Sequence, residues 1–147
     1  MIRHHGPIQI PAPLREYADT IKLQNYKVNT PAKFQVHPIG GLASARLRMN
    51  LGKLLGAPAD RIDYVFFSCC NGAEEHVDQL DPQKHGPNTI IIPIILPTGR
   101  STITAQGETV EVQLDHAYDF DHTKPHSMTL EDTESGCVVI MATVLRA

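Results

Sequence analysis

Two histidines and one aspartate, offered from the two ends of a β-rich segment, are the residues of this chain best placed to do chemistry together. His76 and Asp78 form a His-x-Asp motif, and His126 closes the sequence Phe-Asp-His-Thr-Lys-Pro-His 50 residues later. Two imidazole nitrogens and one carboxylate oxygen suit an iron(II) ion, and they leave its opposite face open for oxygen and a substrate. This segment therefore predicts a metal site, with His76, Asp78 and a later histidine such as His126 as candidate ligands.

The residues around the His-x-Asp motif make a functional interpretation stronger than the motif alone would. The chain has eight histidines, so a short motif of this kind can arise by chance. Here, however, it follows a predicted strand at 62–69 and an Asn71-Gly72 turn. A run of predicted hairpin strands then separates the motif from the second histidine.

His116 and His122 are the rivals of His126 for the third ligand. Both precede the Thr-Lys-Pro turn, whereas His126 follows that turn and opens the next predicted strand. These positions alone leave the third ligand open among the three histidines, although His116 and His122 are each expected to be ordinary surface histidines. His37, beside a proline, and His85, in a Gly-Pro loop, are expected to be exposed to solvent.

Length and composition predict one ordinary globular domain. With 147 residues, the chain can bury a sizeable core. A formal net charge of -3 gives no basic surface for nucleic acid, and no apolar run reaches the roughly 18 residues of a membrane span. The N-terminus has no apolar stretch like that of a signal peptide. We expect a single domain over 1–147, in which residues 1–60 give helical support and residues 61–147 form the core, with no nucleic-acid or membrane partner.

The three cysteines favour a reducing location. Their number is odd, and Cys69 and Cys70 are adjacent, which is not the pattern of a disulfide framework. No pair has the Cys-x-x-Cys spacing of a structural zinc site. We expect buried, idle thiols and a cytoplasmic protein.

The first 60 residues contain two predicted helices. Residues 1–12 are predicted to be a loose or extended lead-in, and Pro13 can be the first residue of a short helix. Residues 24–40 look irregular, with one possible strand at 33–37. Residues 41–56 show the strongest helical pattern in the chain, and Gly56 and Pro58 supply the signals that end the helix. Its apolar residues fall on one stripe, which predicts a face that docks on the sheet: Ala43, Leu47, Leu51, Leu54 and Leu55.

From residue 62 onward the apolar period changes from that of helices to that of strands. Residues 89–96 are apolar on both faces and are therefore predicted to be central, with a bulge or an edge at Pro93. Further strands are predicted at 62–69, 100–105, 108–114, 115–121, 126–130 and 137–145. Short strands separated by regular turn signals, after two helices, predict a mainly β fold: a sandwich or jelly roll buttressed by N-terminal helices.

Over residues 62–146 the chain resembles the iron(II)- and 2-oxoglutarate-dependent oxygenases. That family has a double-stranded β-helix that presents His-x-Asp early and a single histidine late. The resemblance implies that His76, Asp78 and His126 are the iron ligands. It also implies that the cofactors are iron(II) and 2-oxoglutarate, and that the reaction is the oxidative decarboxylation of 2-oxoglutarate coupled to hydroxylation of a substrate.

The chain departs from this family at the residue that grips 2-oxoglutarate. The family usually carries an arginine or lysine about ten residues after the distal histidine, where this chain has Gly136-Cys137. The resemblance leaves two substitutes, Arg100 at the start of a predicted strand and Arg146 at the end of the last one. Arg100 is the preferred candidate, because some family members carry their basic residue there.

Two alternatives remain: one follows from the missing cation, and the other holds if the histidines bind no metal. The first is a cupin-like metal dioxygenase or isomerase that uses no 2-oxoglutarate. The second is a non-catalytic jelly-roll module that binds a ligand or a partner. The β-core leaves little chain for a lid, so an open mouth suits a protein side chain at least as well as a small molecule. The sequence does not name the substrate.

Overall fold

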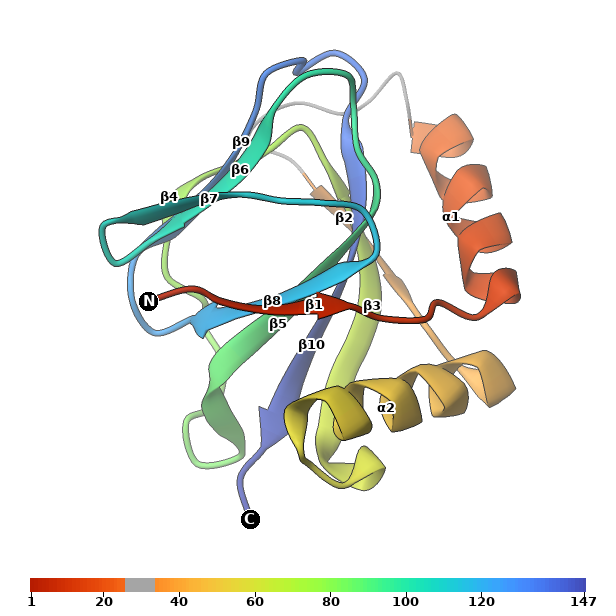
Figure 1. The fold of residues 1–147 in the computed structure, drawn as a ribbon, viewed down its shortest axis with the longest axis vertical. Helices are drawn as coiled ribbons and strands as arrows, with labels where there is room; N and C mark the ends of the chain where they lie inside the picture. The colour runs from red at the N-terminus through yellow and green to blue at the C-terminus, as the bar shows by residue number, and fades with distance from the viewer. Residues whose placement is uncertain (26–33) are drawn as a thin grey trace.

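The computed structural model describes residues 1–25 and 34–147, which form two antiparallel sheets and two α-helices (Figure 1). The six-stranded sheet has the order β1-β8-β5-β10-β3-β2, and the four-stranded sheet has the order β4-β9-β6-β7. The elements are β1 (Arg3–Pro7), α1 (Ala12–Asn25), β2 (Phe34–Pro38), α2 (Gly41–Leu55), the 3-10 turn η1 (Ala59–Arg61), β3 (Ile62–Cys70), β4 (Ala73–His76), β5 (His85–Ile95), β6 (Ser101–Ala105), β7 (Glu108–Glu111), β8 (His116–Asp121), β9 (His126–Leu130) and β10 (Cys137–Leu145). This arrangement confirms the predicted jelly roll.

The strands of the six-stranded sheet present two different faces because side chains alternate along a strand. On β3, Val65 and Phe67 belong to the cluster under the helices, whereas Phe66 and Ser68 line the space between the two sheets. Strand β10 repeats the pattern. Two cores result, one between sheet and helices and one between the two sheets.

Both helices pack on the outer face of the six-stranded sheet, as the sequence predicted (Figure 1). Three apolar residues of α1 are buried there: Leu14, Ala18 and Ile21. On α2, Leu47 and Leu51 are fully buried, and Gly56 ends the helix with a φ of 70°. The Arg48 guanidinium of α2 donates hydrogen bonds to the Ser44 hydroxyl and to the Ile62 carbonyl, which ties the helix to the start of β3.

Replacing Leu51 with alanine tests how tightly α2 docks. Leu51 is 0% exposed, so its removal should leave a cavity under the helix and lower the free energy of unfolding by roughly 2–5 kcal/mol. Leu42→Ala on the same helix is the matched control, since Leu42 is 69% exposed and its loss should cost less than about 0.5 kcal/mol. Chemical denaturation of both variants measures the difference. Equal effects would mean that α2 does not depend on this contact.

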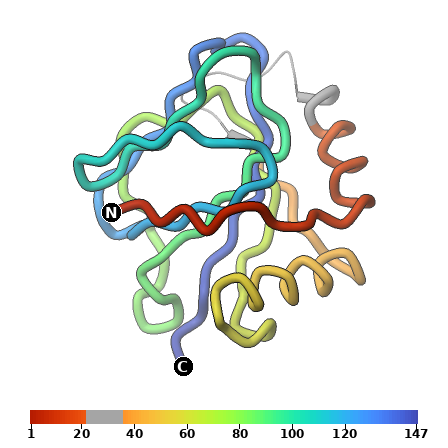
Figure 2. The backbone as a smooth tube through the Cα atoms, viewed as in Figure 1, coloured from red at the N-terminus to blue at the C-terminus, as the bar shows by residue number. Residues whose placement is uncertain are grey.

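The N-terminal segment contributes more to the sheet than the sequence suggested. Residues 3–7 form an edge strand that pairs with β8, and Figure 2 shows this segment running alongside it. The buried Asp119 carboxylate fixes that pairing: it accepts hydrogen bonds from Arg3 and Asn88, and it contacts the His5 ring. The possible strand at 33–37 corresponds to β2, and the expected irregular stretch lies partly outside the described residues, at 26–33.

The proline within the central strand behaves as predicted. Strand β5 lies between β8 and β10, and its register with β10 shifts between the pairs Val138–Ile95 and Val139–Pro93. A residue that lacks an N–H is accommodated at such an irregularity because one ladder hydrogen bond is not needed there.

No helix among the described residues is long and apolar enough to cross a membrane.

Candidate metal centre

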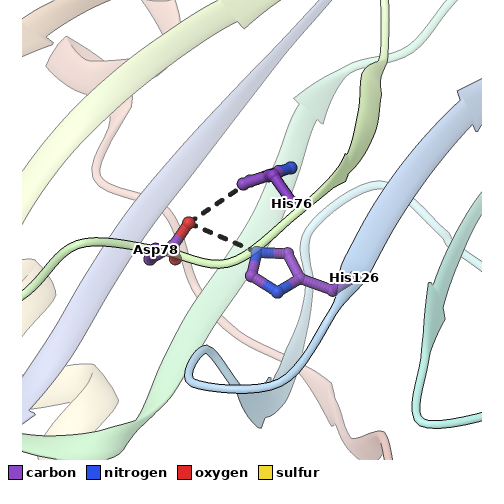
Figure 3. Close-up of side chains that lie close together, drawn as sticks. All are labelled: His76, Asp78 and His126. Carbon is purple, nitrogen blue, oxygen red and sulfur yellow. Dashed lines mark ion pairs between the residues drawn. The ribbon is translucent and has the colours of Figure 1, made fainter.

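His76, Asp78 and His126 converge on one point, as the sequence predicted (Figure 3). His76 is the last residue of β4 and pairs directly with His126, the first residue of β9. Asp78 follows two residues after His76, and its backbone N–H donates a hydrogen bond to the His122 carbonyl. One Asp78 oxygen lies 3.2 Å from His76 Nε2 and 3.3 Å from His126 Nε2. One potential ligand atom from each of the three residues lies within 4.8 Å of the others.

Backbone carbonyls set the orientation of both imidazoles. His76 Nδ1 lies 2.6 Å from the Glu74 carbonyl oxygen, and His126 Nδ1 lies 2.8 Å from that of Lys124. A carbonyl can only accept a hydrogen bond, so Nδ1 of each ring carries the proton and donates it. In the neutral rings, the lone pairs of both Nε2 atoms then face Asp78. Once His126 Nε2 releases its proton, two imidazole nitrogens and a carboxylate, oriented by the backbone, fit a divalent iron ion.

The electrostatics of the site favour a charged carboxylate. Burial acts to raise the pKa of Asp78, but the hydrogen bond with His126 and the charges of the neighbouring imidazoles outweigh it and lower that pKa. Burial acts to lower the pKa of His126, whereas its hydrogen bonds to Asp78 and to the Lys124 carbonyl raise it. Asp78 is thus in its ligand form at neutral pH. A metal ion would replace the proton that it shares with His126.

The triad borders a cavity of about 270 Å³ between the two sheets. The His126 side chain is 7% exposed and that of His76 is 44% exposed. The site therefore lies at the mouth of the cavity, with one side buried and the other open to solvent. The Phe120 ring lies 4.7 Å from the His126 ring and covers one side of it. The rest of the lining is mainly apolar, with a few hydroxyl groups and one thiol: Tyr64, Phe66, Ser68, Cys70, Gly72, Ala73, Leu80, Thr89, Ile91, Ile103, Ser127, Met128, Val139, Met141, Ala142 and Thr143.

No arginine or lysine is among the described residues that line this cavity. The Arg100 side chain is 69% exposed, and its Nε lies 3.4 Å from a Glu111 carboxylate oxygen. Arg146 Nε donates a hydrogen bond to the Pro82 carbonyl outside the cavity. The assignment of either arginine to a cosubstrate carboxylate therefore stays a prediction, with no contact to the cavity in this structure.

Two histidines that were expected to be exposed are buried. His85 is 1% exposed, because its ring stacks on Tyr64 at 4.5 Å and Nδ1 lies 3.1 Å from the Thr143 hydroxyl. His122 is 3% exposed, and its Nε2 lies 2.9 Å from the Gly86 carbonyl oxygen. The His122 backbone carbonyl accepts the hydrogen bond from the Asp78 N–H, but neither imidazole belongs to the triad. His116 lies 2.8 Å from His4 on the β1–β8 edge, away from the triad.

Sequence reasoning missed Tyr64 as part of the cavity. It lies in a bulge of β3, where the register shifts between the pairs Met141–Phe66 and Thr143–Asp63, and its φ is 49°. A bulge turns one side chain away from the alternation of its strand. The pattern of β3 could have indicated Phe66 as an inward residue, but no signal in the sequence marks the bulge.

The comparisons with known proteins agree with the fold. No family model matches the sequence, and no curated protein matches it. Among solved structures, a prolyl hydroxylase from Trichoplax adhaerens, in complex with a peptide fragment of the hypoxia inducible factor oxygen degradation domain, superposes with a TM-score of 0.62. The identity is 12%, over 99% of this chain and 82% of that one.

A Pseudomonas putida prolyl-4-hydroxylase gives a TM-score of 0.58 at 13% identity, over 99% of this chain and 92% of that one. A cupin domain of an Enterobacter cloacae transcriptional regulator gives 0.49 at 15% identity, over 79% of this chain and all of that one. The two prolyl hydroxylases confirm the double-stranded β-helix of the oxygenases that the sequence resembled. At such identities this likeness concerns the fold alone.

Proposed function

We propose that this protein is an iron(II)-dependent oxygenase whose metal ion is held by His76, Asp78 and His126. The observation that carries the proposal is the convergence of these donors, with the Nε2 atoms of both imidazoles directed at the Asp78 carboxylate, on the border of a cavity. An iron(II) ion held there would supply the redox chemistry that activation of dioxygen requires.

The chain's own residues would orient the ligands and keep water out. The backbone carbonyls of Glu74 and Lys124 hold the two imidazoles in one tautomer. Phe120 packs against His126, and the apolar lining excludes water from the space next to it. Because His76 is 44% exposed, the site can receive a group from outside the barrel. A side chain of another macromolecule and a small metabolite both remain candidate substrates.

We further propose 2-oxoglutarate as the cosubstrate and hydroxylation as the outcome. Support comes from the order of the His-x-Asp motif and the later histidine, and from the shared fold with the two prolyl hydroxylases. We also propose a reducing location such as the cytoplasm, because Cys69, Cys70 and Cys137 are buried and none is in a disulfide.

One observation favours a second candidate, a metal dioxygenase or isomerase that uses no 2-oxoglutarate. A dicarboxylate within the barrel would place its far carboxylate next to a lining that has no arginine or lysine among its described residues. A buried carboxylate without a partner is costly. A neutral or largely apolar substrate would fit the same lining without that cost.

A single anaerobic titration separates the two candidates. Iron(II) is added to the metal-free protein, followed by 2-oxoglutarate, and the visible spectrum is followed. We expect a charge-transfer band that appears only when both are present, and succinate on admission of oxygen. Iron binding without the band would favour the second candidate. A protein that binds no stoichiometric metal would contradict both.

A further inference from the structure

Two cysteines face each other at one end of the cavity. Cys70, the last residue of β3, pairs directly with Cys137, the first residue of β10, and their sulfur atoms lie 3.7 Å apart. Residues directly opposite in an antiparallel pair have Cα atoms roughly 4.5–5.5 Å apart, within the range that a disulfide spans. The two thiols can thus be joined by side-chain rotation, without movement of the strands.

The cavity gives a small molecule access to Cys70. Its side chain belongs to the cavity lining, although Cys70 is only 6% exposed overall. The neighbouring Cys69 is 0% exposed and belongs to the cluster under the helices, because successive side chains of β3 point to opposite faces. The three thiols therefore differ sharply in their surroundings: Cys70 borders the cavity, Cys137 lies beside Cys70, and Cys69 lies on the other side of the sheet.

Cys70 and the proposed metal ligands occupy different stretches of the cavity wall. Thr143 of β10 pairs with Thr89 of β5. Thr89 in turn pairs with Phe120 of β8, whose ring packs against His126. Cys137 precedes Thr143 by six residues, which is roughly 20 Å of strand. Oxidation of the two thiols by peroxide consumes no metal ion, so a reaction at Cys70 does not require one at the triad.

The hydrogen bond between the two thiols divides their roles. This bond and one from the Gly72 backbone lower the pKa of Cys70 to about 7, against the opposing effect of burial. The same bond raises the pKa of Cys137, and burial raises it further. Near neutral pH, Cys70 is thus the more nucleophilic thiol, and Cys137 remains protonated beside it.

We propose that Cys70 and Cys137 form a redox-active dithiol that reduces hydrogen peroxide entering the cavity. The Cys70 thiolate attacks one peroxide oxygen, the O–O bond breaks, and a sulfenic acid forms as hydroxide leaves and takes up a proton. Cys137 then attacks the Cys70 sulfur, forming the S–S bond and releasing the oxygen as a second water. One peroxide is reduced and two thiols are oxidised.

Peroxide treatment of the full chain tests this proposal, with a chelator present so that iron plays no part. We expect one equivalent of peroxide to remove two hydrogens from the intact mass and to give a Cys70–Cys137 peptide on mapping. Cys137→Ser should stop at a Cys70 sulfenic acid that dimedone traps. Cys70→Ser should leave Cys137 reduced. Cys69→Ser is the matched control and should form the disulfide like the parent.

The rates decide between a specific site and general oxidation. We expect Cys70 to react at least about tenfold faster than Cys69 in the folded protein, because its thiolate is populated and the cavity reaches it. Equal rates at the two residues, or a folded parent chain that keeps all thiols under peroxide, would overturn the proposal. Neither result depends on iron, so the outcome is independent of the proposed oxygenase activity.

Discussion

His126→Ala is expected to abolish stoichiometric iron(II) binding, with a loss of affinity of more than about 100-fold. His126 supplies one of only two imidazoles in the triad, and its Nε2 lies 3.3 Å from the Asp78 oxygen that faces both rings. Without it, an ion would keep one exposed imidazole and one carboxylate. Anaerobic titration with iron(II), and with manganese(II) as a stand-in that resists oxidation, measures the loss.

His116→Ala is the control for the removal of a histidine. His116 lies on the β1–β8 edge beside His4, so its loss should leave metal affinity unchanged. The circular dichroism of both variants shows whether the fold is intact. One equivalent of metal bound by a folded His126→Ala protein with parental affinity would end the proposal of a metal centre at this triad.

The triad could be predicted from sequence because each ligand lies next to a local signal. His76 and Asp78 follow a turn after a strongly β-forming run, and His126 opens a strand directly after a proline turn. In an antiparallel sheet, the end of β4 and the start of β9 meet at one edge. The resemblance to an oxygenase family, added to these local signals, singled out the three residues, whereas the pairing of β4 with β9 that joins them was not predicted.

The errors concern contacts between residues far apart in the sequence. Residues 3–7 lack an apolar run, and they form a strand only because the edge of β8 and the buried carboxylate of Asp119 are available. His85 and His122 sit among polar and turn residues, which made them look exposed, yet the fold closes over both. Patterns within a segment do not encode such tertiary burial.

The position of a cosubstrate cation is also a tertiary property. The register of β6 with β9 places Ala105 opposite His126 and Ser101 opposite Leu130. Arg100 therefore lies toward the end of the barrel opposite the triad, and its side chain would have to turn into the cavity to meet a carboxylate there. Its guanidinium is exposed and has one long contact, with Glu111, so it can turn without breaking a buried interaction.

Arg100→Met is expected to weaken 2-oxoglutarate binding by roughly 10- to 100-fold, the value of a lost charge-assisted hydrogen bond. Iron binding by the triad should stay as in the parent, because Arg100 has no contact with it. Arg146→Met is the matched control: Arg146 Nε is held by the Pro82 carbonyl outside the cavity, so the change should affect 2-oxoglutarate little. The amplitude of the anaerobic visible band against 2-oxoglutarate concentration gives the affinity of each variant.

If both variants bind 2-oxoglutarate like the parent, neither arginine binds its far carboxylate. If the parent itself binds none, the enzyme acts without this cosubstrate, and the neutral lining of the cavity becomes the guide to its substrate.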